Sequence, residues 1–133
     1  MLSLLREVAE EVINPRFRSL ESDEIAEKTG RRTLAVGTHV GRWDECNALA
    51  DTVLETFGRC DILVNNAGMS PLYAKVTDIT EEYYDKVQGV NLKGPFALSL
   101  RLGGWMRDHD GGVSLNISRV GSIRTSRNEV VYG

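Results

Sequence analysis

The alternation of short apolar runs with longer helical patterns is the sequence feature that most restricts how this chain can fold. Apolar runs at 33–37, 61–65 and 113–118 predict strands, and amphipathic patterns at 43–57 and 81–107 predict helices between them. This order is typical of parallel strands joined by helical crossovers. The sequence therefore predicts an α/β fold in which helices flank a three-stranded parallel sheet.

Two further helices are expected before the first strand. Residues 2–13 carry apolar side chains at helical spacing, and Asn14-Pro15 ends the pattern because the residue before a proline avoids the α region. The segment "SDEIAEKTG" at 22–30 is typical of a short capped helix that ends at glycine. Neither a repeat nor a linker interrupts the chain, so a single domain over 1–133 is predicted.

Composition excludes several classes of function. The 133 residues are 41% hydrophobic and 26% charged with a net charge of −3, and no basic stripe that would favour nucleic-acid binding is present. No run approaches the roughly 20 apolar residues of a membrane helix. The opening "MLSLLREVAEEV" contains acids, which fits neither a signal nor a transit peptide. We expect a cytoplasmic protein without a metal site.

A group of small and uncharged residues follows the strand at 61–65. This group is Asn65-Asn66-Ala67-Gly68, and ligands of parallel sheets sit beyond the carboxyl ends of the strands. Residues with small side chains let a ligand approach the backbone, and asparagine forms hydrogen bonds without adding charge. The alternative is a tight strand-to-helix turn that requires glycine.

Three features in register resemble the short-chain dehydrogenase/reductase family. They are "DILVNNAG" at 61–68, Asn91 in "VNLKGPF", and Tyr132 in "VVYG", which follows a strand ending in "LNIS". The resemblance covers residues 29–133, is weak over 19–28 and is absent over 1–18. Residues 1–28 are accordingly expected to form a divergent helical N-terminus of an incomplete Rossmann-like domain.

The resemblance implies a partial, doubly wound Rossmann-like fold and transfer of hydride between NAD or NADP and a small carbonyl or alcohol substrate. Tyr132 falls on the family's acid/base tyrosine, and Asn91 falls on the asparagine that holds a water for proton relay. Each residue also has an ordinary explanation, as an amphipathic tyrosine at a helix start and as an asparagine bonded to backbone.

The same resemblance implies cofactor-binding positions. Asn66, Ala67 and Gly68 fall on the backbone that lines the adenosine and ribose side of the cofactor. His39 and Val40 fall where the family often has Asp-Val beside the adenine, so the histidine departs from the pattern. A histidine packed at a strand end is the ordinary alternative.

Three features of the family have no counterpart at the expected places. Nothing in residues 1–30 has the glycine-rich form TGxxxGxG that binds pyrophosphate. The lysine expected four residues after Tyr132 would lie past Gly133. The usual serine position is Arg119, which makes Ser118 the candidate serine. We therefore expect a truncated copy that binds cofactor weakly and has little activity alone.

The expected topology follows from these departures. In the family, the strands matching 33–37 and 61–65 are separated by two strands that this chain lacks. We expect 33–37 to pair directly with 61–65 through a right-handed crossover, or the N-terminal helices to cover the gap.

The alternative to an enzyme is a non-catalytic interaction protein built on the same remnant. Helix 81–107 matches the helix through which the family often dimerises, so a homo-oligomer could form there if Leu98, Leu102 and Trp105 are exposed. A third alternative is a reading frame that covers only part of a gene.

Overall fold

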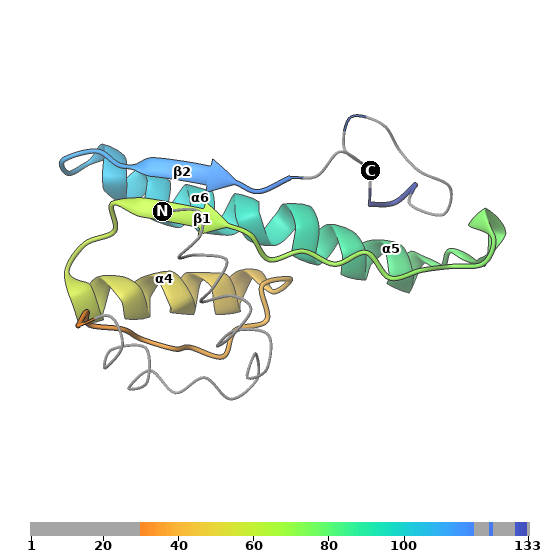
Figure 1. The fold of residues 1–133 in the computed structure, drawn as a ribbon, viewed down its shortest axis with the longest axis horizontal. Helices are drawn as coiled ribbons and strands as arrows, with labels where there is room; N and C mark the ends of the chain where they lie inside the picture. Colours follow the sequence, from red (N-terminus) through yellow and green to blue (C-terminus); the bar gives the residue numbers. More distant parts are fainter. Residues whose placement is uncertain (1–29, 119–122, 124–129, 133) are drawn as a thin grey trace. The chain divides into compact units, whose positions relative to one another are not determined.

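A computed structural model describes residues 30–118, 123 and 130–132 (Figure 1). The chain divides into two compact units, Met1–Gly37 and Thr38–Gly133, and each is considered by itself. The described part of the first unit is residues 30–37. The helices predicted before residue 30 lie outside the described residues.

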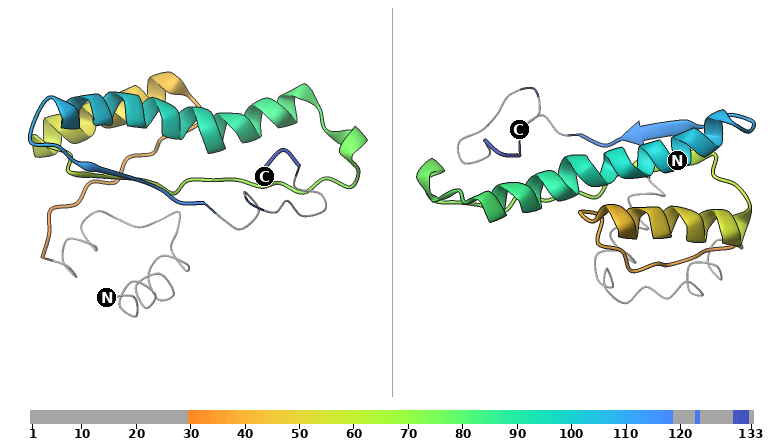
Figure 2. Two further views of the ribbon diagram at one scale, coloured as in Figure 1. Left: turned by 90° about the horizontal axis from the view of Figure 1, so that it is seen from above. Right: turned by 180° about the vertical axis from the view of Figure 1, so that it is seen from behind.

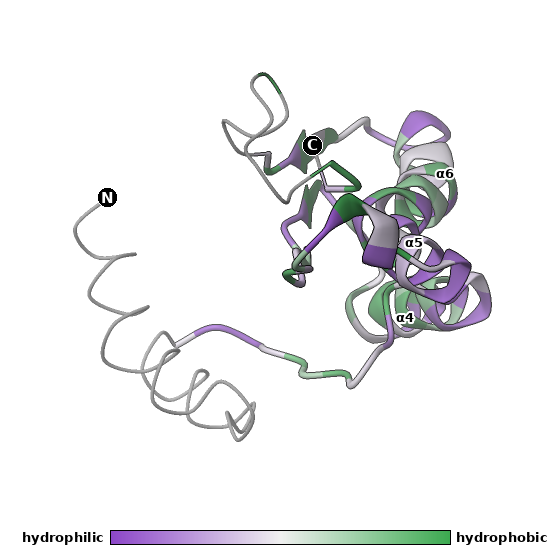
Figure 3. Ribbon diagram, turned by 90° about the vertical axis from the view of Figure 1, so that its right-hand side faces the viewer, coloured by the Kyte–Doolittle hydropathy of each residue, from purple (hydrophilic) through white to green (hydrophobic). Residues whose placement is uncertain are grey.

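The second unit is a two-stranded parallel sheet with helices on one side. Strands β1 and β2 pair in parallel, with Ile62 opposite Val113 and Asn65 opposite Asn116. Viewed end on, α4, α5 and α6 all lie on the same side of the strands (Figure 3). The elements in chain order are α4 (Trp43–Phe57), β1 (Ile62–Asn65), the 3-10 turn η2 (Val76–Asp78), α5 (Glu81–Gln88), the π-helical turn η3 (Gly89–Lys93), α6 (Gly94–Arg107) and β2 (Val113–Asn116).

The predicted third strand is wrong. Residues 33–37 form no strand, and the sheet in the described residues contains β1 and β2 alone. Leu34 and Val36 are each 39% exposed. An apolar run becomes a strand only where another strand satisfies its N–H and C=O groups, and hydropathy alone does not show whether that edge is available.

The core lies between the helices and the inner face of the sheet. Cys46 and Ala50 of α4 are fully buried, and Leu63 of β1 packs in the same cluster. Desolvation by burial raises the pKa of the Cys46 thiol, and the thiol donates to the carbonyl oxygen of Val40. The rest of the buried cluster comes from α6: Ala97, Leu98, Leu102 and Met106.

Leu98 and Leu102, two of the three residues whose exposure would support a homo-oligomer at helix 81–107, are buried. Leu98 is 8% and Leu102 is 4% exposed, because α4 and β1 pack along the side of α6 that carries them. Trp105 is half-buried against the same core. The large apolar side chains that this helical segment exposes are Tyr84, Leu92, Phe96 and Leu100.

The helix predicted over 81–107 is continued through a π-helical turn. A proline inside a helix favours a kink or a break, but Gly89 and Gly94 keep right-handed helical conformations, and the Gly94 N–H bonds to the Gly89 carbonyl, five residues back. Figure 2 shows α5 and α6 as one nearly continuous helix. Since Pro95 has no N–H to give to Asn91, a wider turn replaces the α-helical bond at this point.

The outer face of the sheet is apolar and exposed. Its side chains belong to both strands and are about half exposed or more: Ile62, Val64, Val113, Leu115 and, just beyond β2, Ile117. Within the described ranges, no helix has the length and apolar character that crossing a membrane requires.

Candidate functional site

A cleft of about 340 Å³ lies where β1 and β2 end. Because the strands are parallel, their carboxyl ends meet at one edge of the sheet, and the cleft opens just past Asn65 and Asn116. Six predicted site residues are brought together there although they come from four separate segments. The cleft is lined by Asn66, Ala67, Gly68, Asn91, Ile117, Ser118 and Tyr132.

Asn65 joins the three elements beneath the cleft. Its side-chain amide donates to Asn116 Oδ1 at 2.9 Å and to Ser99 Oγ at 3.2 Å, so both amide hydrogens are used. Only 7% of Asn65 is exposed, and it is the buried polar residue of the described core. Asn65 thus fixes β1 to β2 and to α6 immediately before the residues that line the cleft. In the sequence, the feature that could indicate this role is a polar residue at the end of an apolar strand.

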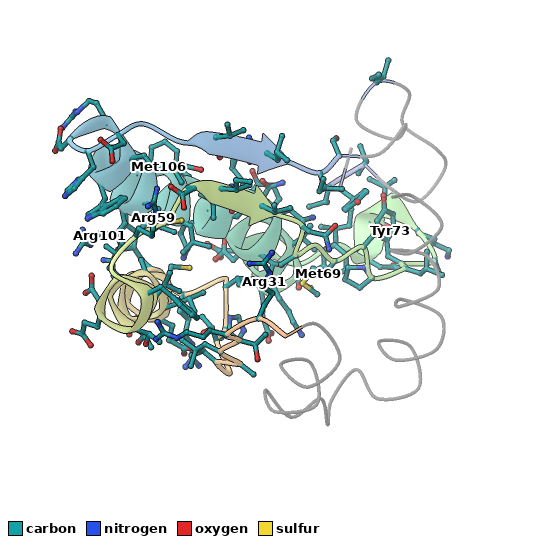
Figure 4. All side chains as sticks on the ribbon, turned by 60° about the vertical axis from the view of Figure 1, so that its left-hand side comes forward. Arg31, Arg59, Met69, Tyr73, Arg101 and Met106 are labelled. Atoms are coloured by element: carbon teal, nitrogen blue, oxygen red, sulfur yellow. The ribbon has the colours of Figure 1, made fainter. Side chains whose placement is uncertain are left out.

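Asn91 attaches the segment after Gly68 to the π-helical turn. Its Oδ1 accepts from the Met69 N–H at 2.8 Å, and its Nδ2 donates to the Met69 carbonyl at 2.9 Å. Figure 4 shows Met69 on the segment that leaves β1. This reciprocal pair satisfies an asparagine that would otherwise be unfavourable in a helix. It also holds the Gly68 backbone beside η3.

Gly68 is not required by the turn itself. A Cβ at Gly68 would have Asn91 Oδ1 as its nearest neighbour at 3.6 Å, an ordinary contact, and its φ is not positive. The alternative explanation, a turn that only glycine can adopt, therefore has no support in this conformation. Gly68 lines the cleft, and so does Asn91, the neighbour that such a Cβ would meet.

The segment that carries Tyr132 is attached by two hydrogen bonds. Val130 N–H donates to the Tyr73 hydroxyl at 2.8 Å, and Gln88 Nε2 donates to the Val131 carbonyl at 2.9 Å. Sequence analysis did not identify Tyr73 or Gln88, since neither belongs to a motif. Arg119, which occupies the usual serine position, lies outside the described residues.

His39 and Val40 do not line the cleft. His39 forms a turn before α4: its N–H donates to Glu45 Oε2 at 2.6 Å, and its Nδ1 accepts from the Gly41 N–H. The first of these bonds is the main cause that lowers the pKa of Glu45. Val40 lines a separate apolar hollow of about 300 Å³ that also reaches Asn66 and Ala67. Val40 therefore lies near the carboxyl end of β1 without lining the cleft.

The chemistry of the cleft lining is polar but uncharged. The lining offers amides, a hydroxyl, a phenol and backbone, and among the described residues no group of three or more His, Cys, Asp or Glu side chains could hold a metal ion. Such a lining suits proton transfer through Tyr132 and close contact of a ligand with the main chain.

Comparison with known proteins identifies relatives of this chain. A family model described as enoyl-(acyl carrier protein) reductase matches residues 7–133. The match begins well before the predicted start of the resemblance, so the expectation of no resemblance over 1–18 is wrong for 7–18. An "uncharacterized oxidoreductase" of Thermotoga maritima is 36% identical over 105 residues, which is 72% of this chain and 41% of that protein.

Two solved structures share the fold. A putative short-chain alcohol dehydrogenase from Sinorhizobium meliloti is 33% identical with a TM-score of 0.77, covering 82% of this chain and 43% of that one. A metagenomic short-chain oxidoreductase in complex with NADP is 28% identical with a TM-score of 0.76, covering 84% and 49%. The chain thus spans less than half the length of these relatives. Its fold is of the Rossmann type, and the chain is a member of the short-chain dehydrogenase/reductase family.

Proposed function

We propose that the cleft is part of the active site of an NAD- or NADP-dependent oxidoreductase that acts on a small carbonyl or alcohol in the cytoplasm. The observation that carries the proposal is the common cleft of Tyr132 with Asn66, Ala67 and Gly68 at the carboxyl end of the sheet. Support also comes from the relative whose structure contains NADP.

The lining fits one part of a nicotinamide dinucleotide. Asn66, Ala67 and Gly68 present small, uncharged residues, and Gly68 keeps open a space that a methyl group would partly fill. These residues would hold the adenosine and ribose side against the main chain. When bound, the nicotinamide donates or accepts the hydride. The weaker part of the fit is the pyrophosphate, because residues 1–30 contain no glycine-rich turn.

Two residues of this chain would act on the substrate oxygen, and a third would hold a water for proton relay. The Tyr132 phenol gives its proton to the oxygen as a carbonyl is reduced and takes it back as an alcohol is oxidised. The Ser118 hydroxyl donates a hydrogen bond to the same oxygen. Asn91 would hold a relay water through the second hydrogen of its Nδ2 or through its backbone carbonyl, which receives no α-helical bond because residue 95 is proline.

Cofactor binding by this chain should be weak. We expect isothermal titration with NAD⁺ and NADP⁺ to give dissociation constants weaker than about 1 µM, equivalent to less than roughly 8 kcal/mol. Amide chemical shifts recorded with millimolar cofactor should nevertheless change most at residues 66–69. Shift changes that leave these amides unaffected, with either cofactor, would overturn the proposed binding site.

Replacing Gly68 by alanine separates a ligand role from a turn role. The new methyl group meets only Asn91 Oδ1 at ordinary distance, so the melting temperature should change little. Shift changes at residues 66–69 on adding cofactor should fall by about tenfold at equal concentration, a loss of about 1.4 kcal/mol in affinity. A large drop in melting temperature with unchanged binding would favour the turn explanation.

Replacing Tyr132 by phenylalanine tests the proton-transfer role. Any carbonyl reduction that the wild-type chain shows with NADH or NADPH should fall by about 10²- to 10⁴-fold, the usual contribution of a general acid. Tyr84→Phe is the matched control, because Tyr84 is exposed on α5 and does not line the cleft. Equal activities for the two variants would contradict the role of Tyr132.

A further inference from the structure

Two hydrogen bonds converge on the backbone just before Tyr132. The Val130 N–H donates to a side-chain hydroxyl, and the Val131 carbonyl accepts from a side-chain amide. The partners, Tyr73 and Gln88, lie 57 and 43 residues away in the sequence. Bonds at two consecutive residues restrict both the position and the rotation of the peptide units that lead to Tyr132.

Tyr73 is itself held in place. It is only 9% exposed, and its ring packs edge-on against Tyr83 with the centroids 5.7 Å apart and the planes at 89°. Tyr83 in turn donates its hydroxyl hydrogen to the Pro71 carbonyl. Figure 4 shows Tyr73 beyond Met69, on the segment that leaves β1. The Tyr73 hydroxyl is therefore a fixed acceptor.

Gln88 connects the same segment to the helix that carries Asn91. It is the last residue of α5, directly before the π-helical turn that contains Asn91. Because the Val131 carbonyl can only accept, the Gln88 amide must present its nitrogen to it. A shift of this helix end would move Asn91 and the Tyr132 segment together.

We infer that Tyr73 and Gln88 are positioning residues, a clamp that fixes where the Tyr132 phenol lies in the cleft relative to Asn91 and Ser118. The inference rests on the proposed function for its catalytic meaning. Transfer of a proton requires the donor within about 2.6–3.2 Å of the acceptor, and a displacement of about 1 Å can cost roughly 10²-fold in rate. The clamp supplies this precision to a residue that lies outside the sheet and the helices.

Two substitutions remove one bond each and keep the shape of the side chain. Tyr73→Phe keeps the ring that packs on Tyr83 but loses the hydroxyl that accepts from Val130. Gln88→Glu keeps the length of the side chain but replaces the donor with a carboxylate. Tyr84→Phe again serves as the control, since Tyr84 lies on the same helix as Gln88 and is exposed.

The first measurement needs neither cofactor nor activity. In Tyr73→Phe, exchange of the Val130 amide hydrogen should speed up by about tenfold, and both variants should shift the ring resonances of Tyr132. Tyr84→Phe should leave both signals unchanged. Unaltered Val130 exchange and Tyr132 resonances in the two variants would overturn the clamp, whatever the activity.

The second measurement is kinetic. Both variants should lower kcat by about 10- to 100-fold with KM for the cofactor unchanged, because Tyr132 moves while residues 66–68 do not. A rise in KM alone would overturn the positioning role. If the wild-type chain shows no turnover or cofactor binding, the proposed function fails, and the clamp is then decided by amide exchange and ring resonances.

Discussion

Gly94→Ala is expected to lower the free energy of unfolding by roughly 3 kcal/mol. A Cβ at Gly94 would overlap the carbonyl oxygen of Val40, in the turn that leads into α4. The obstacle is backbone, so no change of rotamer relieves it, and either that turn or α6 must move. Urea denaturation followed by circular dichroism measures the change through its midpoint.

Gly103→Ala is the matched control for this prediction. Gly103 lies on the same helix, and a Cβ there meets no other atom within 4 Å. Alanine is the better helix former, so this substitution should stabilise the chain by about 0.5–1 kcal/mol. Opposite signs for the two variants are the expected result, and equal effects would show that close packing at Gly94 is not the cause.

Asn65→Ala is expected to cost roughly 2–4 kcal/mol in the free energy of unfolding. The substitution removes two hydrogen bonds and leaves Asn116 Oδ1 and Ser99 Oγ without that donor in a partly buried place. It also leaves a small cavity between β1 and α6. Asn66→Ala, at the next and exposed residue, should change stability by less than about 0.5 kcal/mol.

A double-mutant cycle identifies the partner. If the strands are joined through Asn65 and Asn116, the two alanine substitutions should show a coupling energy of about 1 kcal/mol or more. Additive effects in the same denaturation experiment would mean that the cost of Asn65→Ala comes from the cavity and the lost bond to Ser99, and that Asn116 is not the partner that matters.

The elements that repeat a local pattern were predictable from the sequence. Helix 43–57 ends at Gly58, whose φ of 74° suits glycine, and the strands predicted at 61–65 and 113–118 contain β1 and β2. What could not be predicted depends on partners. The run at 33–37 has the hydropathy of a strand, but strand formation also needs a free edge. Which side of α6 is buried likewise depends on where α4 packs.

In the candidate site, too, some residues could be predicted from the sequence and others could not. The residues that line the cleft were predictable because NNAG, Asn91 and Tyr132 keep the order and spacing of a family. Tyr73 and Gln88 were not, since each acts through one hydrogen bond to a backbone group far along the chain, and such a bond has no sequence signature. His39 does not line the cleft, and its backbone N–H bonds to Glu45 in a short turn before α4; its predicted place beside the adenine stays a prediction.

The π-helical turn at Gly89–Lys93 has a consequence for the two halves of this long helix. Each residue advances an α-helix by about 100°, so the additional residue in the wide turn rotates everything after it by about that angle. The two stretches can then present different sides: Gln88 to the chain end near Tyr132, and Leu98 and Leu102 to the core. A helix of uniform pitch would need one side to serve both purposes.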